Sequence, residues 1–434
     1  MMANKQRRIL RDNKLAQKCI SSAKRETDII LKNSSVINGL EYMMVPRFQW
    51  DELVIGAKLG QGGFSDVFEV SSISLKEKNC MKDKDSDRIF DTTGDQVLDD
   101  EKSGFLKFNV NVDDCRSYIA SRCRRKSKDE ARYAVKHLSS DIRENQTLFR
   151  KGAIDLLVEV LFLTSINHPH IIKIRGLAVN DMDSFLDTTG KGYFIIMDRL
   201  YEILDKKILQ WAAIEQKNRN SLTSRLKMKK KTSPSRNRCL SERLYVAFHI
   251  ASALNYLHEH NIVYRDLKPE NIGFDVRGDV KLFDFGLVKE IYPNHKKQFG
   301  GVYNLSGNTG TRRYMSPEVA KFLPYNMLTD VYSYGLLLWE MTSLKQPFKG
   351  FSPREHSERV VYGNERPKLL QSWPLDLKTL MKMCWSEQIE IRPSFTEIKM
   401  VLKDVILHLR GGDSTGLDFS SDSKSSRYEE DDSS

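Results

Sequence analysis

The chain has 434 residues, a length too great for one minimal domain and too small for several large ones. With 40% hydrophobic and 29% charged residues, its composition is that of an ordinary globular protein with a sizeable core. The six cysteines are scattered, with no CxxC pair and no metal-ligand spacing. So long a chain disfavours a disulfide framework, and we expect buried or free thiols in a reducing compartment.

The N-terminal residues carry no recognisable targeting signal. Residues 1–32 lack the apolar core of a signal peptide, and residue 2 is Met2 rather than the glycine that N-myristoylation requires. No stretch approaches the roughly 18 consecutive apolar residues of a membrane span. We therefore expect an intracellular protein, in the cytoplasm or the nucleus, without a membrane as partner.

The net charge of +11 is concentrated in the first thirty residues and in Lys217–Arg238, whereas the last twenty residues are acidic. Such runs are usually solvated surface. A docking surface for acidic partners, a nuclear-localisation signal and an inhibitory contact with the acidic tail remain alternatives for the basic run. Nucleic acid is disfavoured as a partner, because no aromatic residues are interleaved to stack bases.

Taken in chain order, residues 1–48 predict a basic extension, either an amphipathic helix or a disordered segment. Short β-type runs then predict a hairpin, in which Leu53–Ile55 leads into a glycine-rich turn and Val67–Val70 returns. The polar residues 71–130 are an insert before the next expected strand, Arg132–Lys136.

A helical pattern of apolar residues follows that strand and ends near His168. Tyr193–Met197 predicts a short buried strand, and the basic, serine-rich residues 215–240 predict a second, flexible insert. The periodicity is then mostly helical to about Leu409, and residues 411–434 predict a disordered acidic tail. A β-rich part followed by a helical part predicts an α+β protein with two lobes.

The glycine-rich turn has the spacing Gly60-x-Gly62-x-x-Ser65-x-Val67. Glycines allow backbone N–H groups to approach phosphate oxygens without a Cβ atom in the way. The turn lies between two strands rather than before a helix, which disfavours a dinucleotide site, and the chain has no GxxxxGK[ST]. An ordinary tight hairpin is the structural alternative.

Lys136 follows Ala134 on a mostly apolar strand, where a lysine must find an anion or reach water. Its candidate partner is Glu159 in the next helix, since a carboxylate among apolar neighbours is costly unless it is paired. Asp155, one turn earlier, is the competing partner. A surface lysine on an edge strand is the structural alternative.

Three further motifs follow in order. The run Tyr264–Asn271 (YRDLKPEN) matches the catalytic-loop pattern HRDLxxxN, with Tyr264 in place of histidine. Asp284-Phe285-Gly286 follows thirteen residues after Asn271, at the end of a strand-like run. Ser316-Pro317-Glu318 stands in place of Ala-Pro-Glu, and Arg392 is a candidate ion-pair partner of Glu318.

Together these motifs resemble the eukaryotic protein kinase family, closest to its tyrosine-kinase-like group, over residues 49–410. The resemblance implies a small β-rich N-lobe and a larger, mostly helical C-lobe, with ATP and Mg²⁺ between them. It implies a substrate-hydroxyl contact for Asp266, a phosphate contact for Lys268, and metal contacts for Asn271 and Asp284. The implied nucleotide contacts are Leu59, Gly60, Gly62, Gly63, Phe64, Ser65, Val67, Ala134, Lys136, Met197, Asp198, Leu200 and Asp284.

The same resemblance makes Met197 the gatekeeper and Asp198–Leu200 the hinge that binds adenine. Tyr264 keeps an aromatic ring that can pack against Phe285. Gly273 stands where the family usually has an apolar side chain beneath adenine. We therefore predict a roomier pocket floor and weaker ATP affinity.

Lys268 and the pair Gly310-Thr311 resemble the serine/threonine-specific members of the family, and this resemblance predicts transfer to serine and threonine hydroxyls of protein substrates. A pseudokinase scaffold that binds nucleotide without turnover is the alternative function. Thr311 is expected to contact Asp266.

Arg265 can pair with a phosphate on the activation segment, residues 284–318, and Lys289 is a second candidate cation. The candidate phosphorylation sites there are Tyr303, Ser306 and Thr309.

Overall fold

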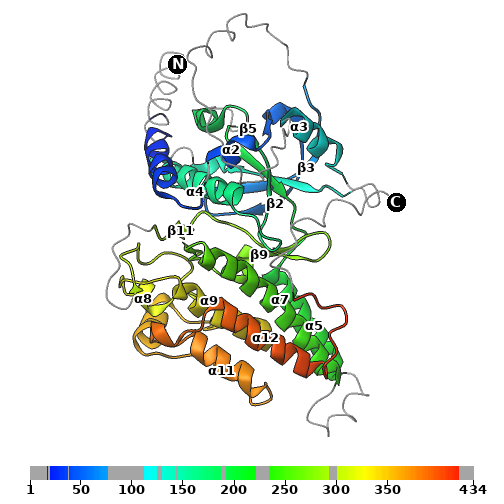
Figure 1. Ribbon diagram of the computed structural model, residues 1–434, viewed down its shortest axis with the longest axis vertical. Helices are drawn as coiled ribbons and strands as arrows, with labels where there is room; N and C mark the ends of the chain where they lie inside the picture. The colour runs from blue at the N-terminus through cyan, green and yellow to red at the C-terminus, as the bar shows by residue number, and fades with distance from the viewer. Residues whose placement is uncertain are drawn as a thin grey trace, which may run out of the picture.

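The structure is a computed structural model, and it describes Gln17 and residues 20–37, 39–76, 112–124, 130–142, 145–186, 192–220, 234–292 and 301–419. The elements form two lobes, a β-rich one and a helical one (Figure 1), as the α+β prediction requires. The middle of each predicted insert and residues 420–434 of the tail lie outside the described residues. Within the described chain, no helix has the length and apolar character of a membrane span.

A six-stranded sheet forms the small lobe, in the order β1-β5-β6-β4-β3-β2. Strands β2 and β3 form the predicted hairpin on either side of the glycine-rich turn. Strand β1 joins the far edge parallel to β5, with Arg47 opposite Leu177. The bounds are β1 Arg47–Phe48, β2 Leu53–Gln61, β3 Ser65–Ile73, β4 Tyr133–Leu138, β5 Ile174–Ala178 and β6 Phe194–Asp198.

Strand β4 lies inside this sheet, between β3 and β6, with Val67 and Ile195 on either side of Lys136. Lys136 is therefore not an edge-strand lysine. The predicted helix is α4, Gln146–Ser165, whose first turn is capped by the Asn145 side chain. Its apolar residues bury against the sheet, and they surround the buried carboxylate of Glu159.

The helical lobe is built around α9, Leu328–Ser343, which is buried along most of its length. Helix α7, Pro234–Glu259, packs against both α9 and α12. Among the described residues, the other α-helices of this lobe are α5 Leu204–Asn220, α8 Pro317–Ala320, α10 Pro353–Glu355, α11 Leu375–Cys384 and α12 Phe395–Leu409.

Two small sheets lie between the lobes and carry the site residues. The first has the order β10-β9-β7, and the second pairs β11 with β8. Strand β8 leads directly into the run Tyr264–Asn271, and β11 follows Asp284-Phe285-Gly286. The bounds are β7 Glu202–Ile203, β8 Ile262–Val263, β9 Ile272–Phe274, β10 Val280–Leu282 and β11 Lys289–Glu290.

Both ends of the predicted flexible insert 215–240 are helical, which corrects that prediction. Residues 215–220 belong to α5 and residues 234–240 to α7. Glu215 on α5 accepts a hydrogen bond of 2.7 Å from the buried guanidinium of Arg243 on α7, so the two helices are tied together.

The end of the first insert also packs on the small lobe. Residues Val112–Ser121 form helix α3, and Arg116 on this helix pairs with the buried Glu52 at 2.6 Å. A buried carboxylate requires such a partner, and this requirement fixes the helix to the sheet.

The prediction of a disordered tail over residues 411–434 is wrong for the first residues of that range. The backbone N–H of Asp418 donates to the Tyr245 hydroxyl at 2.8 Å, and Phe419 packs edge-on against Phe248 on α7.

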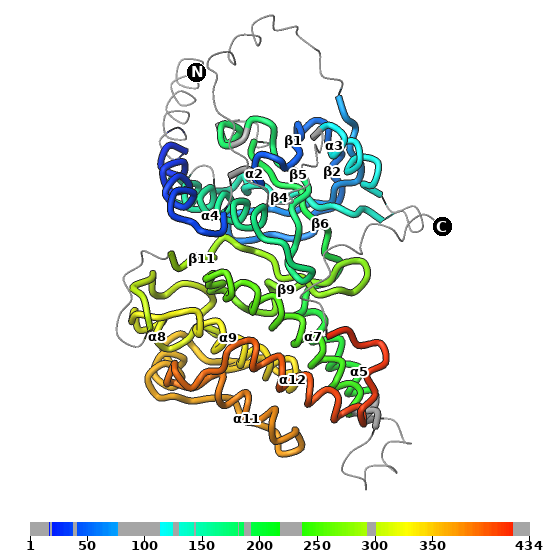
Figure 2. The backbone as a smooth tube through the Cα atoms, in the orientation of Figure 1, coloured from blue at the N-terminus to red at the C-terminus, as the bar shows by residue number. Residues whose placement is uncertain are grey.

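The N-terminal pattern that predicted either a helix or disorder is helical over residues 20–33. Ile20, Ala23 and Thr27 on this helix are buried. The segment lies beside α4 in Figures 1 and 2, and α2, Gly39–Met44, also contacts α4. Part of the predicted extension 1–48 is thus packed on the small lobe.

Candidate active site

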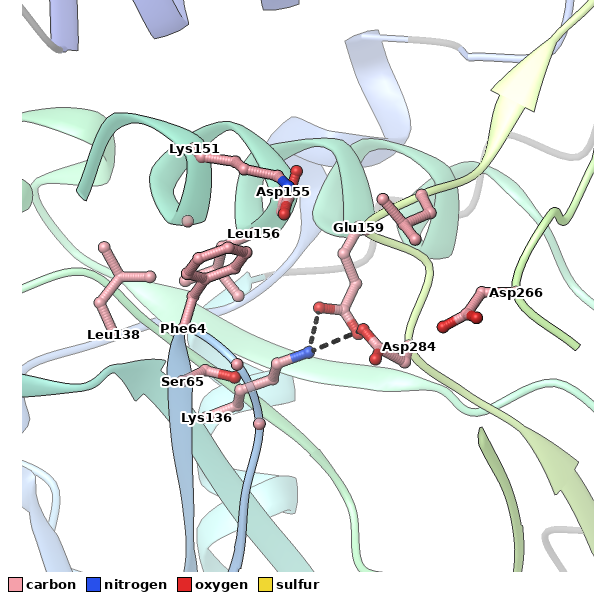
Figure 3. Close-up of a pocket in the computed structure, with 15 residues that line it drawn as sticks. Phe64, Ser65, Lys136, Leu138, Lys151, Asp155, Leu156, Glu159, Asp266 and Asp284 are labelled. Carbon is pink, nitrogen blue, oxygen red and sulfur yellow. Dashed lines mark hydrogen bonds and ion pairs between the residues drawn. The ribbon is translucent and has the colours of Figure 1, made fainter. Parts of the chain in front are cut away.

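Lys136 and Glu159 form a buried ion pair between β4 and α4. The Lys136 ammonium lies 2.5 Å from Glu159 Oε2 and 3.5 Å from Asp284 Oδ1 (Figure 3). Burial alone lowers the pKa of Lys136, but the two carboxylates outweigh it and raise the pKa above its ordinary value. The lysine is therefore a fixed cation, and Glu159 rather than Asp155 is its partner on α4.

Asp266 is the centre of a hydrogen-bond network in the catalytic loop. Its Oδ1 atom accepts from the Thr311 backbone N–H at 2.8 Å and from the Thr311 hydroxyl at 2.7 Å. Its Oδ2 atom accepts from Lys268 at 2.6 Å and from the Asn271 amide at 3.1 Å. Lys268 also donates to the Thr311 hydroxyl at 3.0 Å. The expected contact between Thr311 and Asp266 is confirmed.

Asp330, at the start of α9, holds the backbone of the catalytic loop. This buried carboxylate accepts from the N–H groups of Tyr264 and Arg265, each at 2.8 Å. Arg265 itself has a left-handed backbone, with φ of 70°. The sequence alone does not predict this role of Asp330, because its partners lie more than sixty residues earlier in the chain.

Tyr264 packs against Phe285 with ring centroids 5.4 Å apart, as expected. Its hydroxyl donates to the carbonyl of Phe283, directly before Asp284. Burial raises the pKa of this hydroxyl well above its ordinary value, so it remains a donor. The tyrosine thus ties the catalytic loop to the Asp284-Phe285-Gly286 motif.

A cavity of about 190 Å³ lies between the glycine-rich turn, α4 and Asp284. It brings together the predicted residues Gly62, Gly63, Phe64, Ser65, Lys136, Glu159, Asp266 and Asp284. The other predicted nucleotide contacts do not line it; they lie along β2, β3, β4, β6 and the connection after β6, and they are Leu59, Gly60, Val67, Ala134, Met197, Asp198 and Leu200.

The tip of the glycine-rich turn packs against α4 through Phe64. A Cβ atom at Gly152 would lie 2.8 Å from Phe64 Cβ, and the Lys151 ammonium lies 5.4 Å from the centre of the Phe64 ring. Cβ atoms at Gly60 and Gly63 would meet no atom within 4 Å. The turn therefore has open space where a phosphate group could approach its backbone.

Asp155 also lines the cavity, one turn before Glu159 (Figure 3). Burial, with a further contribution from the Asp284 carboxylate, raises the pKa of Asp155 to about 6, against the opposing effect of Lys151. This carboxyl group at the edge of the site therefore keeps its proton to a higher pH than an ordinary aspartate.

The space beside Gly273 is not open, contrary to the expectation of a roomier pocket floor. A Cβ atom at Gly273 would lie 2.6 Å from Leu200 Cδ1, so the Leu200 side chain already fills the space in question. The predicted roomier pocket floor is therefore wrong. Asp198 uses its carboxylate elsewhere, since Arg175 donates to both of its oxygens at 2.7 and 3.0 Å.

The residues present fit a nucleotide with a divalent cation. Asn271 commits its amide nitrogen to Asp266, which leaves its carbonyl oxygen, and Asp284 has a half-exposed carboxylate. Two oxygen donors completed by phosphate oxygens are the ligand set that Mg²⁺ prefers. No cluster of three or more His, Cys, Asp or Glu side chains suited to a metal occurs among the described residues.

In the activation segment, Ser306 is the candidate that meets Arg265. The Arg265 guanidinium donates to the exposed Ser306 hydroxyl at 2.7 Å and to the carbonyl of Leu287 at 2.6 Å. Thr309 instead directs its hydroxyl to the Ser306 and Gly307 carbonyls. Tyr303 pairs through its backbone with Tyr325.

The predicted ion pair at the end of the segment is present. Arg392 donates to both carboxylate oxygens of Glu318, at 2.6 and 2.9 Å, and both side chains are buried. This bidentate contact fixes the base of the activation segment to the helical lobe.

The sequence is similar to known protein kinases. A family model described as "Protein tyrosine and serine/threonine kinase" matches residues 116–402. The chain is 38% identical to the Serine/threonine/tyrosine-protein kinase HT1 of Arabidopsis thaliana over 161 residues, 37% of this chain and 39% of the relative. It is 35% identical to the Serine/threonine-protein kinase STY17 of the same plant over 163 residues, 38% of this chain and 27% of the relative.

A longer match joins the chain to the Dual specificity protein kinase shkC of Dictyostelium discoideum. The two are 32% identical over 303 residues, which is 69% of this chain and 50% of the relative. The chain thus spans between 27% and 50% of the length of these three relatives.

Proposed function

Since the chain belongs to the protein tyrosine and serine/threonine kinase family, we propose that it is an active enzyme that transfers the γ-phosphate of ATP to serine and threonine hydroxyls of protein substrates, in intracellular signalling.

The arrangement of Lys268 carries this proposal. Its ammonium contacts both Asp266 and Thr311, which supports a site built for Ser/Thr acceptors. Asp266 would orient the incoming hydroxyl and accept its proton, while Lys268 and Lys136 would balance the charge of the transferred phosphate. ATP supplies the phosphoryl group, and we propose Mg²⁺ as its counter-ion, held by Asn271 and Asp284.

Radiolabelled ATP and a mixture of protein substrates would test activity. We expect phosphate transfer by the wild type and a loss of about 100-fold or more in Asp266→Asn, which keeps the shape but not the basicity of the side chain. Asp376→Asn, an exposed acid on α11, is the control. Labelling by the wild type that does not exceed the background without enzyme would favour the pseudokinase alternative.

The acceptor needs a separate measurement, because the relatives include both a serine/threonine kinase and dual-specificity enzymes by name. Phosphoamino-acid analysis of labelled substrates should give phosphoserine and phosphothreonine. A predominance of phosphotyrosine would refute the Ser/Thr assignment and leave the kinase assignment intact.

We also propose that a phosphate on the activation segment pairs with Arg265, and Ser306 is the favoured site of the three candidates. It is exposed and already contacts Arg265, whereas Thr309 uses its hydroxyl within its own turn. Burial, and after it the positive charge of Arg265, lowers the pKa of Lys289, the second candidate cation. Ser306→Ala should lower turnover more than Thr309→Ala; equal turnover of Ser306→Ala and wild type would contradict this.

Residues 221–233 lie outside the described residues, so docking of acidic partners on the basic insert rests on its charge alone and stays a proposal. A location in the cytoplasm or the nucleus also stays a proposal.

A further inference from the structure

Residues 20–37, named here the N-terminal strap, lie against the helix that carries Glu159. Ile20 and Ala23 are buried within the main hydrophobic core. Glu26 lies 3.8 Å from Arg150 at the start of α4, and the strap lies beside α4 in Figure 1. The strap is therefore a packed neighbour of α4.

The strap ends in a turn that binds a buried carboxyl group in β11, one of the strands between the lobes. The Ser35 N–H and hydroxyl donate to Glu290 Oε1 at 2.8 and 2.7 Å, and the Ser34 hydroxyl donates to Glu290 Oε2. The Ser34 oxygen accepts from the backbone N–H groups of Val36 and Ile37, which fixes the turn. Glu290 is fully buried, and Ser35 is exposed.

A carboxylate without solvent contact must receive its hydrogen bonds from the protein. Within the described part of the chain, the hydrogen bonds to the Glu290 side chain come from these two serines. The strap thus supplies the hydrogen-bond donors that the buried Glu290 side chain needs.

Glu290 is placed at the joint between the catalytic loop and the activation segment. It lies in β11, opposite Ile262 in β8, and β8 leads directly into Tyr264–Asp266. The next residue, Ile291, donates its N–H to the carbonyl of Asn261 at 2.8 Å. A displacement of Glu290 would therefore disturb the pairing of β8 with β11, next to the loop that carries Asp266.

We propose that Ser34, Ser35 and Glu290 form an intramolecular clasp that couples the strap and α4 to the activation segment. The three are positioning residues for phosphoryl transfer, and the inference rests on the proposed kinase function. With the clasp closed, α4 is held so that Glu159 meets Lys136, and β11 is held against β8. With the clasp open, the Glu290 carboxylate turns toward water and the strap leaves α4. The Glu159–Lys136 contact and the pairing of β11 with β8 then become less ordered.

Charge can open the clasp and a second change can close it again. Ser35→Asp places a carboxylate against Glu290 and should open it by repulsion. In Ser35→Asp/Glu290→Gln, the glutamine amide can donate to the new aspartate, so the contact returns with reversed polarity. Ser34→Ala/Ser35→Ala removes both hydroxyl donors. Ser21→Asp, an exposed change on the helical part of the strap, is the matched control.

Two readouts separate positioning from general stability, and both are taken well below the unfolding temperature of each full-length variant. We expect Ser35→Asp and Ser34→Ala/Ser35→Ala to lower kcat about tenfold, because misplacement of a catalytic group costs turnover. We expect faster hydrogen–deuterium exchange in residues 20–37, 146–165 and 289–292 of these variants. The double variant Ser35→Asp/Glu290→Gln should regain most of the wild-type kcat and most of the protection from exchange. Ser21→Asp should resemble the wild type in both measurements.

The proposal is overturned if Ser35→Asp turns over within twofold of the wild type, or if faster exchange is confined to the strap while α4 and β11 stay protected. It is also overturned if adding Glu290→Gln to Ser35→Asp does not restore kcat and protection from exchange. If Ser35→Asp does not fold, the single change Ser35→Ala is judged by the same criteria. If the wild type shows no turnover at all, the proposed function fails, and the exchange pattern still decides the clasp.

Discussion

Leu200 fills the space above Gly273 that a side chain at that position would need. Leu200 Cδ1 would lie 2.6 Å and Leu200 Cβ 3.2 Å from a Cβ atom placed on Gly273. Gly273 is in β9, hydrogen-bonded to both β7 and β10, so its backbone has little freedom to move away. The two residues are therefore a matched large and small pair.

This relationship reverses the expected effect of filling Gly273. Gly273→Leu should clash with Leu200, cost about 1–3 kcal/mol of unfolding free energy, and raise the KM for ATP. The pair Gly273→Leu/Leu200→Ala should recover most of both quantities, since the total volume is then nearly conserved. Denaturant unfolding and ATP titrations of the single and paired variants check this; a lower KM in Gly273→Leu alone would contradict it.

Variants of the Lys136–Glu159 ion pair should show that its effects on stability and on activity are separable. Lys136→Met leaves the buried Glu159 carboxylate without its cation, and we expect a loss of about 3 kcal/mol together with loss of turnover. Lys136→Met/Glu159→Leu removes both charges and should regain most of the stability but none of the activity. A double-mutant cycle by thermal or denaturant unfolding measures the coupling, and additive losses would argue against the pair.

Asp155 predicts a pH dependence of stability. Its folded-state pKa is raised from 3.8 to about 6, because burial and Asp284 disfavour the charged form. The unfolded chain therefore binds fewer protons in this range, and stability falls as pH rises from about 4 to about 6. Asp155→Asn should remove that decline and gain about 1–2 kcal/mol above pH 6.

Unfolding free energies of wild type and Asp155→Asn between pH 4 and pH 8 test this dependence. Asp376→Asn, on an exposed part of α11, controls for loss of one negative charge. A parallel pH profile for the wild type and Asp155→Asn would show that this carboxyl group does not titrate there.

Gly310 should be the least replaceable glycine of the activation segment. Its φ is 98°, and a Cβ atom there would lie 2.3 Å from the Arg265 carbonyl oxygen. Gly310→Ala should displace Arg265 or Thr311, and with it the hydrogen bonds to Asp266, so kcat should fall at least tenfold.

Gly278 is the matched control, because its φ of 85° carries the same backbone strain while its Cβ position is open. Gly278→Ala should cost about 1–2 kcal/mol in unfolding free energy with kcat unchanged. Equal losses of kcat in the two variants would mean that strain, rather than the contact with Arg265, is responsible.

The amino-acid sequence by itself determined which residues carry the chemistry. Asp266, Lys268 and Asn271 lie within six residues of one another, and phosphoryl transfer needs those side-chain types at that short spacing. The hairpin around the glycine-rich turn and the helix bearing Glu159 also follow from local patterns.

Tertiary structure alone decided how those residues are held. Asp330 supports Tyr264 from 66 residues away, and Ser34 reaches Glu290 across 256 residues. Leu200 compensates for Gly273 only because β7 and β9 are neighbours in one sheet. Such contacts depend on which buried groups the fold brings together, and a buried polar group has no local sequence pattern that names its distant partner.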